Sequence, residues 1–142
     1  MNAFDEAKSL SKTERESFFK NVFESAKTRA VRAANNFTPE PMIVGHPVST
    51  FSNEIDATKP IHFIEGGVCG FAWVNIKPGN SAFARWLVKN GLARKDDYYG
   101  GVTIWVHEFG QSLQRKEAYA HTFANALREY GLRRVYGQSR MD

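Results

Sequence analysis

A histidine and a glutamate stand side by side at His107 and Glu108, inside the run YYGGVTIWVHEFGQS of residues 98–112. Such a pair could serve general acid–base catalysis if its side chains could exchange a proton. The run is rich in β-branched and aromatic residues, which are typical of strands, and successive strand side chains point to opposite faces of a sheet. We therefore expect the two side chains to point apart and predict no catalytic dyad.

The same alternation predicts one aliphatic and one aromatic face for the strands expected at 68–76 and 101–109. The aliphatic face holds Ala72, Val74, Ile76, Val102, Ile104 and Val106, and the aromatic face holds Phe71, Trp73, Asn75, Thr103, Trp105, His107 and Phe109. Nucleic-acid bases stack on flat aromatic surfaces. Trp73, Trp105 and His107 are therefore candidate nucleic-acid-binding residues. The alternative is that an N-terminal helix rich in phenylalanine covers this face and makes it a second core.

Basic residues supply the second candidate feature. The net charge is +4, and residues 81–142 hold ten Lys or Arg against six Asp or Glu. The candidates for binding a phosphate backbone are Arg94, Lys95, Arg133, Arg134 and Arg140. Both Arg-containing pairs, 94–95 and 133–134, follow expected helix ends, so we expect them to cluster on one edge of the sheet. Cations also complement a helix dipole there, which explains part of their placement without any ligand.

The turn Lys77-Pro-Gly-Asn80-Ser81 precedes an expected helix. Free backbone N–H groups and the positive end of the helix dipole favour an anion at such a point, and Lys77 adds charge. Lys77, Asn80 and Ser81 are therefore a candidate anion site, although the spacing is not that of a Walker A loop. The alternative is that Asn80 or Ser81 only caps the helix.

Metal and nucleophile chemistry have little support. The four histidines are scattered, and the single cysteine, Cys69, lies in an expected strand, so we predict no metal site, cofactor or catalytic residue. One cysteine allows no intrachain disulfide, which favours a reducing compartment. The first thirty residues are too charged for a signal peptide or membrane span. We expect no membrane association and a cytoplasmic location.

The 142 residues, 42% apolar and 24% charged, predict a single domain, residues 1–142. Residues 1–36 are predicted to form a helical region, with overlapping capping boxes at 11–16. The proline-rich residues 37–60 are predicted to form an irregular connector with a short strand at Met42–Val44. The core at 61–142 follows the order β-β-α-β-α-β: strands at 61–65 and 68–76 joined by a hairpin, a helix ending at 90–91, a strand at 101–109, a helix at 112–130 and a strand at 133–137. The predicted fold class is α+β, a mixed sheet of about four strands with two helices on one face, plus the N-terminal helix.

Residues 61–142 contain two similar units. The first holds GGV at 66, WV at 73, GNS at 79 and GLAR at 91, and the second holds GGV at 100, WV at 105, GQS at 110 and GLRR at 131. One interpretation is that the two units arose by duplication. The other is that they share only the glycine and serine residues that most strand–helix units have at their turns and helix caps. Duplication predicts related strands in one sheet and both helices on one face. As helix C-caps, Gly91 and Gly131 are expected to adopt positive φ.

Four strings carry a resemblance: PEPMIVGHP, EGGVCGFAWVNIKPGNSAFARWL, YYGGVTIWVHEFGQSLQRKEAYAHTFANAL and the final SRMD. Over residues 38–142 the chain resembles a family of small proteins of tailed bacteriophages. The resemblance implies a phage product made in the cytoplasm of a bacterial host. It also implies either an accessory protein that acts on nucleic acid or host machinery, or a structural part of the particle.

Three functional interpretations follow. The first is non-enzymatic binding of nucleic acid through the basic edge and the aromatic face. The second is a virion or assembly protein with a phage or host protein as partner, which makes large apolar self-contacts. The third is an enzyme with a pocket that joins Lys77, Ser81 and His107. The sequence does not indicate the oligomeric state.

Overall fold

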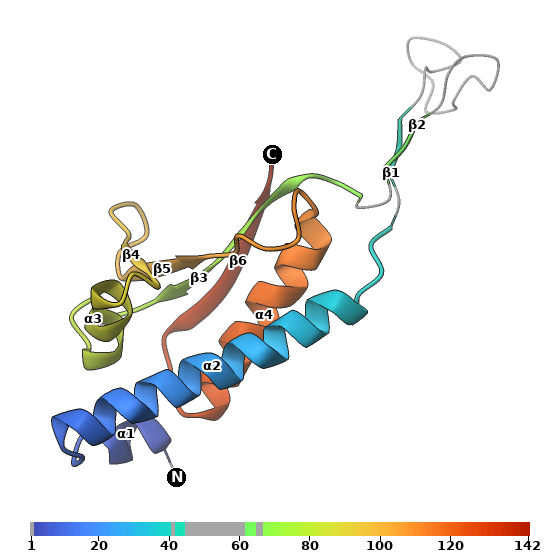
Figure 1. Ribbon diagram of the computed structural model, residues 1–142. Helices are drawn as coiled ribbons and strands as arrows, with labels where there is room; N and C mark the ends of the chain where they lie inside the picture. Colours follow the sequence, from blue (N-terminus) through green and yellow to red (C-terminus); the bar gives the residue numbers. More distant parts are fainter. Residues whose placement is uncertain (1, 41, 45–61, 65–66) are drawn as a thin grey trace.

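The computed structural model describes residues 2–40, 42–44, 62–64 and 67–142. Its helices are α1 (Ala3–Ala7), α2 (Lys12–Asn36), α3 (Ala82–Lys89) and α4 (Leu113–Glu129). Its strands are β1 (Met42–Val44), β2 (His62–Ile64), β3 (Gly70–Ile76), β4 (Arg94–Lys95), β5 (Val102–Trp105) and β6 (Val135–Met141) (Figure 1). This arrangement confirms the predicted α+β class and the four-stranded sheet.

The main sheet has the strand order β4-β5-β3-β6. Each neighbouring pair of its strands is antiparallel, so the sheet is antiparallel and not mixed as expected. The strand at Met42–Val44 is confirmed, but β2 pairs with it in a separate two-stranded sheet, so the expected hairpin between β2 and β3 was wrong. The turn at 65–66 and most of the predicted connector lie outside the described residues.

The two similar units interleave in the sheet. Strand β3 is followed by α3 and β4, and β5 is followed by α4 and β6, while β4 pairs with β5 and β6 pairs with β3. If the strands of one unit are exchanged for those of the other, the same strand order results, read from the opposite edge of the sheet. Trp73 and Trp105, which occupy equivalent positions in the two units, are cross-strand partners at the centre of the sheet. In each unit the helix connects two strands that lie on either side of the first strand of the other unit. Descent from a duplication stays a prediction.

Strand lengths differ from expectation. Strand β5 ends at Trp105, well before residue 109, and the chain then turns at Phe109 and Gly110, which both have positive φ. Strand β6 continues to Met141, four residues past the expected end, because its final residues pair with the first half of β3. The longer β6 brings Arg140 into the sheet opposite Phe71.

Local signals explain the helix boundaries. Serine hydroxyls accept hydrogen bonds from backbone N–H groups at the starts of α2, α3 and α4, the caps being Ser11, Ser81 and Ser112. Gly91 and Gly131 end α3 and α4 with φ of 70° and 109°, which confirms the predicted positive values. The following N–H groups, of Leu92 and Leu132, return to carbonyls five residues earlier, as in a Schellman motif.

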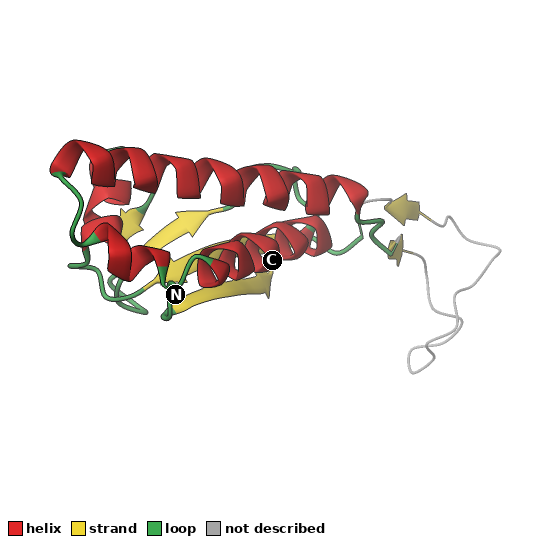
Figure 2. Ribbon diagram, turned by 90° about the horizontal axis from the view of Figure 1, so that it is seen from below, coloured by secondary structure: helices red, strands yellow, loops and turns green. Residues whose placement is uncertain are grey.

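The core lies between the aliphatic face of the sheet and the helices. Val74, Ile76 and Val102 are buried together with side chains of α2, α3 and α4. Helix α2 runs along α4 (Figure 2), and its Phe23 contacts Phe123 of α4. The phenylalanine stripe of α2 therefore packs on the helix side of the sheet. The alternative in which the N-terminal helix covers the aromatic face was wrong.

Candidate nucleic-acid interface

The face of the sheet opposite the helices carries three rows of side chains that run across the strands. Cross-strand partners share a face, so the register defines the rows. They are Trp105–Trp73–Gln138, Arg94–Thr103–Asn75–Tyr136 and Phe71–Arg140. The predicted aromatic face is confirmed for Phe71, Trp73, Asn75, Thr103 and Trp105, and β6 adds a tyrosine and an arginine to it. Phe109 was wrongly assigned to this face: β5 ends before it, and its ring packs against Tyr119 of α4.

The two tryptophans at its centre have different roles. Trp73 is 5% exposed, because Trp105 and Tyr99 lie against its ring, and its Nε1 donates a hydrogen bond to Gln138 Oε1 at 2.8 Å. Trp105 is 39% exposed. The buried indole supports the exposed one, which leaves a flat aromatic surface open to solvent.

The loop after β4 covers one end of this face. Asp96 accepts a hydrogen bond from Thr103 Oγ1 at 2.6 Å and others from the backbone N–H groups of Tyr98 and Tyr99. The Thr103 hydroxyl, aided by these N–H groups and by the charge of Lys77, lowers the pKa of Asp96, against the opposing effect of burial. The loop thus holds two exposed tyrosines at the margin of the aromatic face.

A pocket of about 350 Å³ opens at the other end of the face. We call it the Phe71 pocket; its lining residues are Phe71, Trp105, Val106, His107, Lys116 and Arg140. Two cations lie over the Phe71 ring, Arg140 with its guanidinium carbon 5.5 Å and Lys116 with Nζ 5.7 Å from the ring centroid. Aromatic walls and cationic groups are the chemistry that suits a base and a phosphate.

Lys116 is the unusual member of this pocket. The residue is only 7% exposed, and its Nζ donates to the backbone oxygen of Gly70 at 3.4 Å. Within the part of the chain that the structure describes, no carboxylate lies within ion-pair distance of this ammonium. Buried charges are normally paired, because losing hydration is costly. The Phe71 pocket therefore holds a buried lysine to which the described residues supply no carboxylate partner.

Sequence reasoning did not single out Lys116 as a site residue. The signal was present, since position 116 falls at helical spacing on the buried stripe that also contains Leu113, Ala120 and Phe123. A lysine on the apolar stripe of a helix is an exception to the rule that charged side chains stay at the surface, and it calls for an explanation. That explanation becomes visible only when the helix is placed against Phe71.

The structure brings together some of the predicted nucleic-acid-binding residues and separates others. Trp73, Trp105, His107 and Arg140 lie on one face or in its pocket, and Arg94 lies on the same face on the far side of β5. Lys95 is the exposed neighbour of Arg94 on edge strand β4. Arg133 and Arg134 precede β6, the opposite edge strand, so the expected clustering of the two basic pairs on one edge was wrong.

The predicted anion residues lie elsewhere. Lys77 and Ser81 line a second pocket together with Arg133 and Arg134, whereas Asn80 is not among its lining residues. We call this the Lys77 pocket. Ser81 is the helix cap, because its Oγ accepts from the N–H of Ala84 at 3.2 Å. His107 lines the Phe71 pocket, so no described pocket joins Lys77, Ser81 and His107.

His107 and Glu108 also have different surroundings, as the alternation predicted. His107 lines the Phe71 pocket, whereas Glu108 lies beside Tyr119 of α4. Burial, together with the charge and hydrogen bonding of Glu108, raises the pKa of the Tyr119 phenol. The prediction that the neighbouring pair forms no dyad therefore agrees with the geometry.

These features define an α+β protein whose helices cover one face of an antiparallel sheet and leave an aromatic, cationic face open. No group of three or more His, Cys, Asp or Glu among the described residues could hold a metal ion, and no described helix has the length and apolarity to span a membrane. No family model, curated protein or solved structure matches the chain.

Proposed function

We propose that the protein binds single-stranded nucleic acid on the open face of its sheet, with Trp105 as the stacking surface and the Phe71 pocket as the phosphate site. The observation that carries the proposal is the buried Lys116 ammonium, which has no carboxylate partner among the described residues and lies next to an exposed tryptophan. A phosphate group supplies the missing negative charge. A base stacked on Trp105 keeps that phosphate close to Arg140 and Lys116.

The aromatic chemistry of the face favours a single strand over a duplex. Exposed rings occur on β5, on β6 and in the loop after β4, at Trp105, Tyr136 and Tyr99. A base offers its flat surface to such rings only when it is unstacked from its neighbours, and each stacked base contributes about 1–3 kcal/mol. Duplex DNA hides these surfaces, and its grooves accept a protruding helix or ribbon more readily than a sheet face.

Fluorescence anisotropy with short fluorescein-labelled oligothymidylate, oligouridylate and a blunt duplex tests the proposal. Wild-type protein should bind both single strands at low salt more tightly than the duplex, and affinity should fall as salt rises. Lys116→Met and Arg140→Gln should each weaken binding. The matched control is Lys20→Met, because Lys20 is an exposed lysine of α2, on the helix side of the sheet.

Two results would overturn this function. One is the absence of any retained single strand at low salt. The other is duplex binding as tight as single-strand binding and equally tight in the Lys116 and Arg140 variants, which would indicate nonspecific attraction to the basic chain. Far-UV circular dichroism of each variant establishes that a loss of binding is not a loss of fold.

A structural role in a particle is the second candidate. It is favoured by β6, a seven-residue edge strand that pairs with β3 alone among the described strands and ends at the exposed Met141. An open edge of this length is a template for pairing with another chain. The resemblance to small phage proteins is compatible with either role, and we propose both for an infected bacterium. Sedimentation that shows concentration-dependent assembly, without nucleic-acid binding, would favour this second candidate.

A further inference from the structure

We infer that the Lys77 pocket binds a small amphipathic anion, an organic carboxylate or phosphate ester with an apolar body. The pocket has a volume of about 400 Å³, within the range of roughly 300–1,000 Å³ that is usual for small-molecule sites. It lies where α1, the start of α2, the turn before α3 and the turn after α4 meet. Its apolar surface comes from Phe4, Phe19, Phe83 and Leu132.

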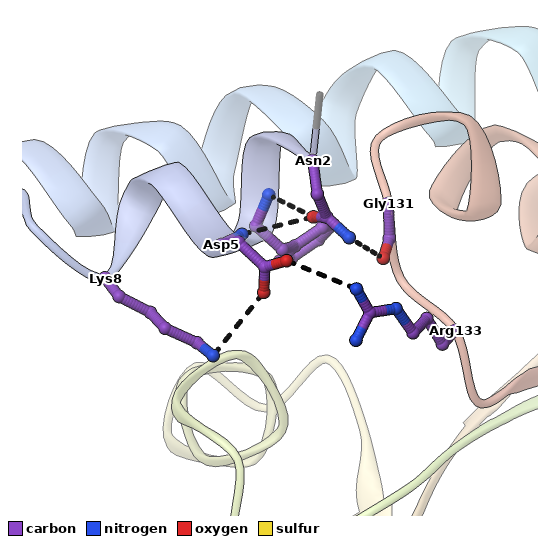
Figure 3. A network of polar contacts seen from close by, with 6 residues as sticks. Asn2, Asp5, Lys8, Gly131 and Arg133 are labelled. Carbon is purple, nitrogen blue, oxygen red and sulfur yellow. Dashed lines mark hydrogen bonds and ion pairs between the residues drawn. The ribbon is translucent and has the colours of Figure 1, made fainter.

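The charges around this apolar surface are strongly biased. Five cationic side chains line the pocket, Lys8, Arg15, Lys77, Arg133 and Arg134, against one carboxylate, that of Asp5. Asp5 is already paired with Lys8 at 3.4 Å and with Arg133 at 3.3 Å (Figure 3). The pocket therefore has no carboxylate left for its remaining cations.

The remaining cations divide into one structural residue and two candidates for binding. Arg15 donates to the backbone oxygens of Ala7 and Leu10, which holds the end of α1. Within the described chain, no carboxylate lies within ion-pair distance of Lys77 or Arg134. Strand pairing brings these two residues together, because the N–H of Lys77 donates to the oxygen of Arg134 at 2.9 Å. An anionic group would complement both side chains at once.

The wall formed by α1 is fastened before any ligand arrives. Asn2 donates from Nδ2 to the backbone oxygen of Gly131 at 2.7 Å, while its Oδ1 accepts from the N–H groups of Phe4 and Asp5 (Figure 3). One side chain thus caps α1 and joins it to the turn after α4. A preformed wall reduces the entropy lost on binding. The first turn of α3, which begins behind Ser81, adds the positive end of its dipole.

Isothermal titration calorimetry with four octyl compounds tests the inference. Octanoate and octyl phosphate should bind, whereas octanol and octylammonium should not. Lys77→Met and Arg134→Gln should each lose about tenfold in affinity for the two anions, since a charged hydrogen bond is removed. Ala82→Phe should abolish binding because it fills the pocket and removes no charge, and Lys20→Met should behave as wild type. Binding of only one of the two anions supports the inference and identifies the head group.

The inference is wrong if octanol binds as tightly as octanoate, if neither anion binds, or if the Lys77 and Arg134 variants bind both anions as wild type does. Its outcome is independent of the nucleic-acid site. Lys116→Met should leave octanoate and octyl phosphate binding unchanged, and Arg134→Gln should leave oligothymidylate binding unchanged. Failure of one site is therefore distinguishable from failure of the other. Thermal melts of every variant check that the pocket still folds.

Discussion

The indole rings of Trp73 and Trp105 lie with their centroids 5.1 Å apart across the β3–β5 pair, yet only Trp105 is substantially open to solvent. Equivalent positions in two similar units therefore serve different purposes. One ring completes the packing of the sheet, and the other presents a surface. This difference leads to opposite expectations for the two alanine variants.

Trp105→Ala should reduce the affinity for single-stranded nucleic acid by about 1–3 kcal/mol without changing its salt dependence, because stacking releases no counterions. Trp73→Ala should instead lower the free energy of unfolding by about 3–5 kcal/mol, since it removes a buried ring and its hydrogen bond to Gln138. Anisotropy titrations and urea unfolding measure the two effects. A larger loss of stability in Trp105→Ala than in Trp73→Ala would contradict the assignment.

Lys116→Met should have opposite effects on the stability of the fold and on nucleic-acid binding. Removing a buried ammonium without a carboxylate partner in the described chain should raise the free energy of unfolding by about 1 kcal/mol, because methionine is buried at little cost. The same change should weaken oligothymidylate binding and flatten the plot of log affinity against log salt by about 0.7, the value of one phosphate contact. A destabilised variant with unchanged affinity would show that Lys116 has a structural role.

Arg133 and Arg134 should matter less for nucleic acid than Arg140 does. Arg134 immediately precedes β6 and Arg140 lies near its end, roughly 20 Å away at the rise of an extended strand. That separation exceeds the screening length of about 8 Å at physiological salt. The double change of Arg133 and Arg134 to Ala should leave oligothymidylate affinity near the wild-type value, whereas Arg140→Gln lowers it. Equal losses in both variants would mean that the strand crosses the whole sheet.

Gly131→Ala should be more harmful than Gly91→Ala. Both glycines have positive φ, which costs an alanine about 1–2 kcal/mol. A Cβ at Gly91 would meet no atom within 4 Å, whereas one at Gly131 would collide with the side chain of Asn2. The second substitution therefore also disturbs the Asn2 hydrogen bond, worth about another 1 kcal/mol. Thermal melts of the two variants, and of Asn2→Ala, measure the difference; equal melting temperatures would refute it.

Asp96→Asn should destabilise the protein in a pH-dependent way. The folded protein lowers the pKa of Asp96, mainly through the Thr103 hydroxyl, so the ionised carboxylate stabilises the fold above the unfolded pKa of about 3.9. That contribution disappears as pH falls from there through the folded pKa. The variant should be less stable than wild type by about 1 kcal/mol at neutral pH, and the gap should close in acid. Urea unfolding across this range checks it, and a gap that widens in acid would reverse the sign.

Local patterns in the sequence were sufficient for the elements and their faces. Period-two alternation placed Trp73 and Trp105 on one face and Val74 and Val106 on the other, because the strand backbone alternates whatever its neighbours are. Serine caps and the Gly131 stop marked the ends of helices because they satisfy backbone groups within a few residues. These features depend on interactions that are short in sequence.

Tertiary structure decided everything that depends on which elements are neighbours. Strand order separated Arg94 from Arg134, and the packing of α2 on α4 left the aromatic face open. The packing of α4 on β3 buried Lys116 beside Phe71, and the rings of Trp105 and Tyr99 cover Trp73, which leaves Trp105 the more exposed of the two indoles. The alternation of side chains along a strand does not determine which strand is its neighbour or which face of the sheet a helix covers. Only the joint burial of distant apolar surfaces selects one arrangement, and with it the residues that share a site.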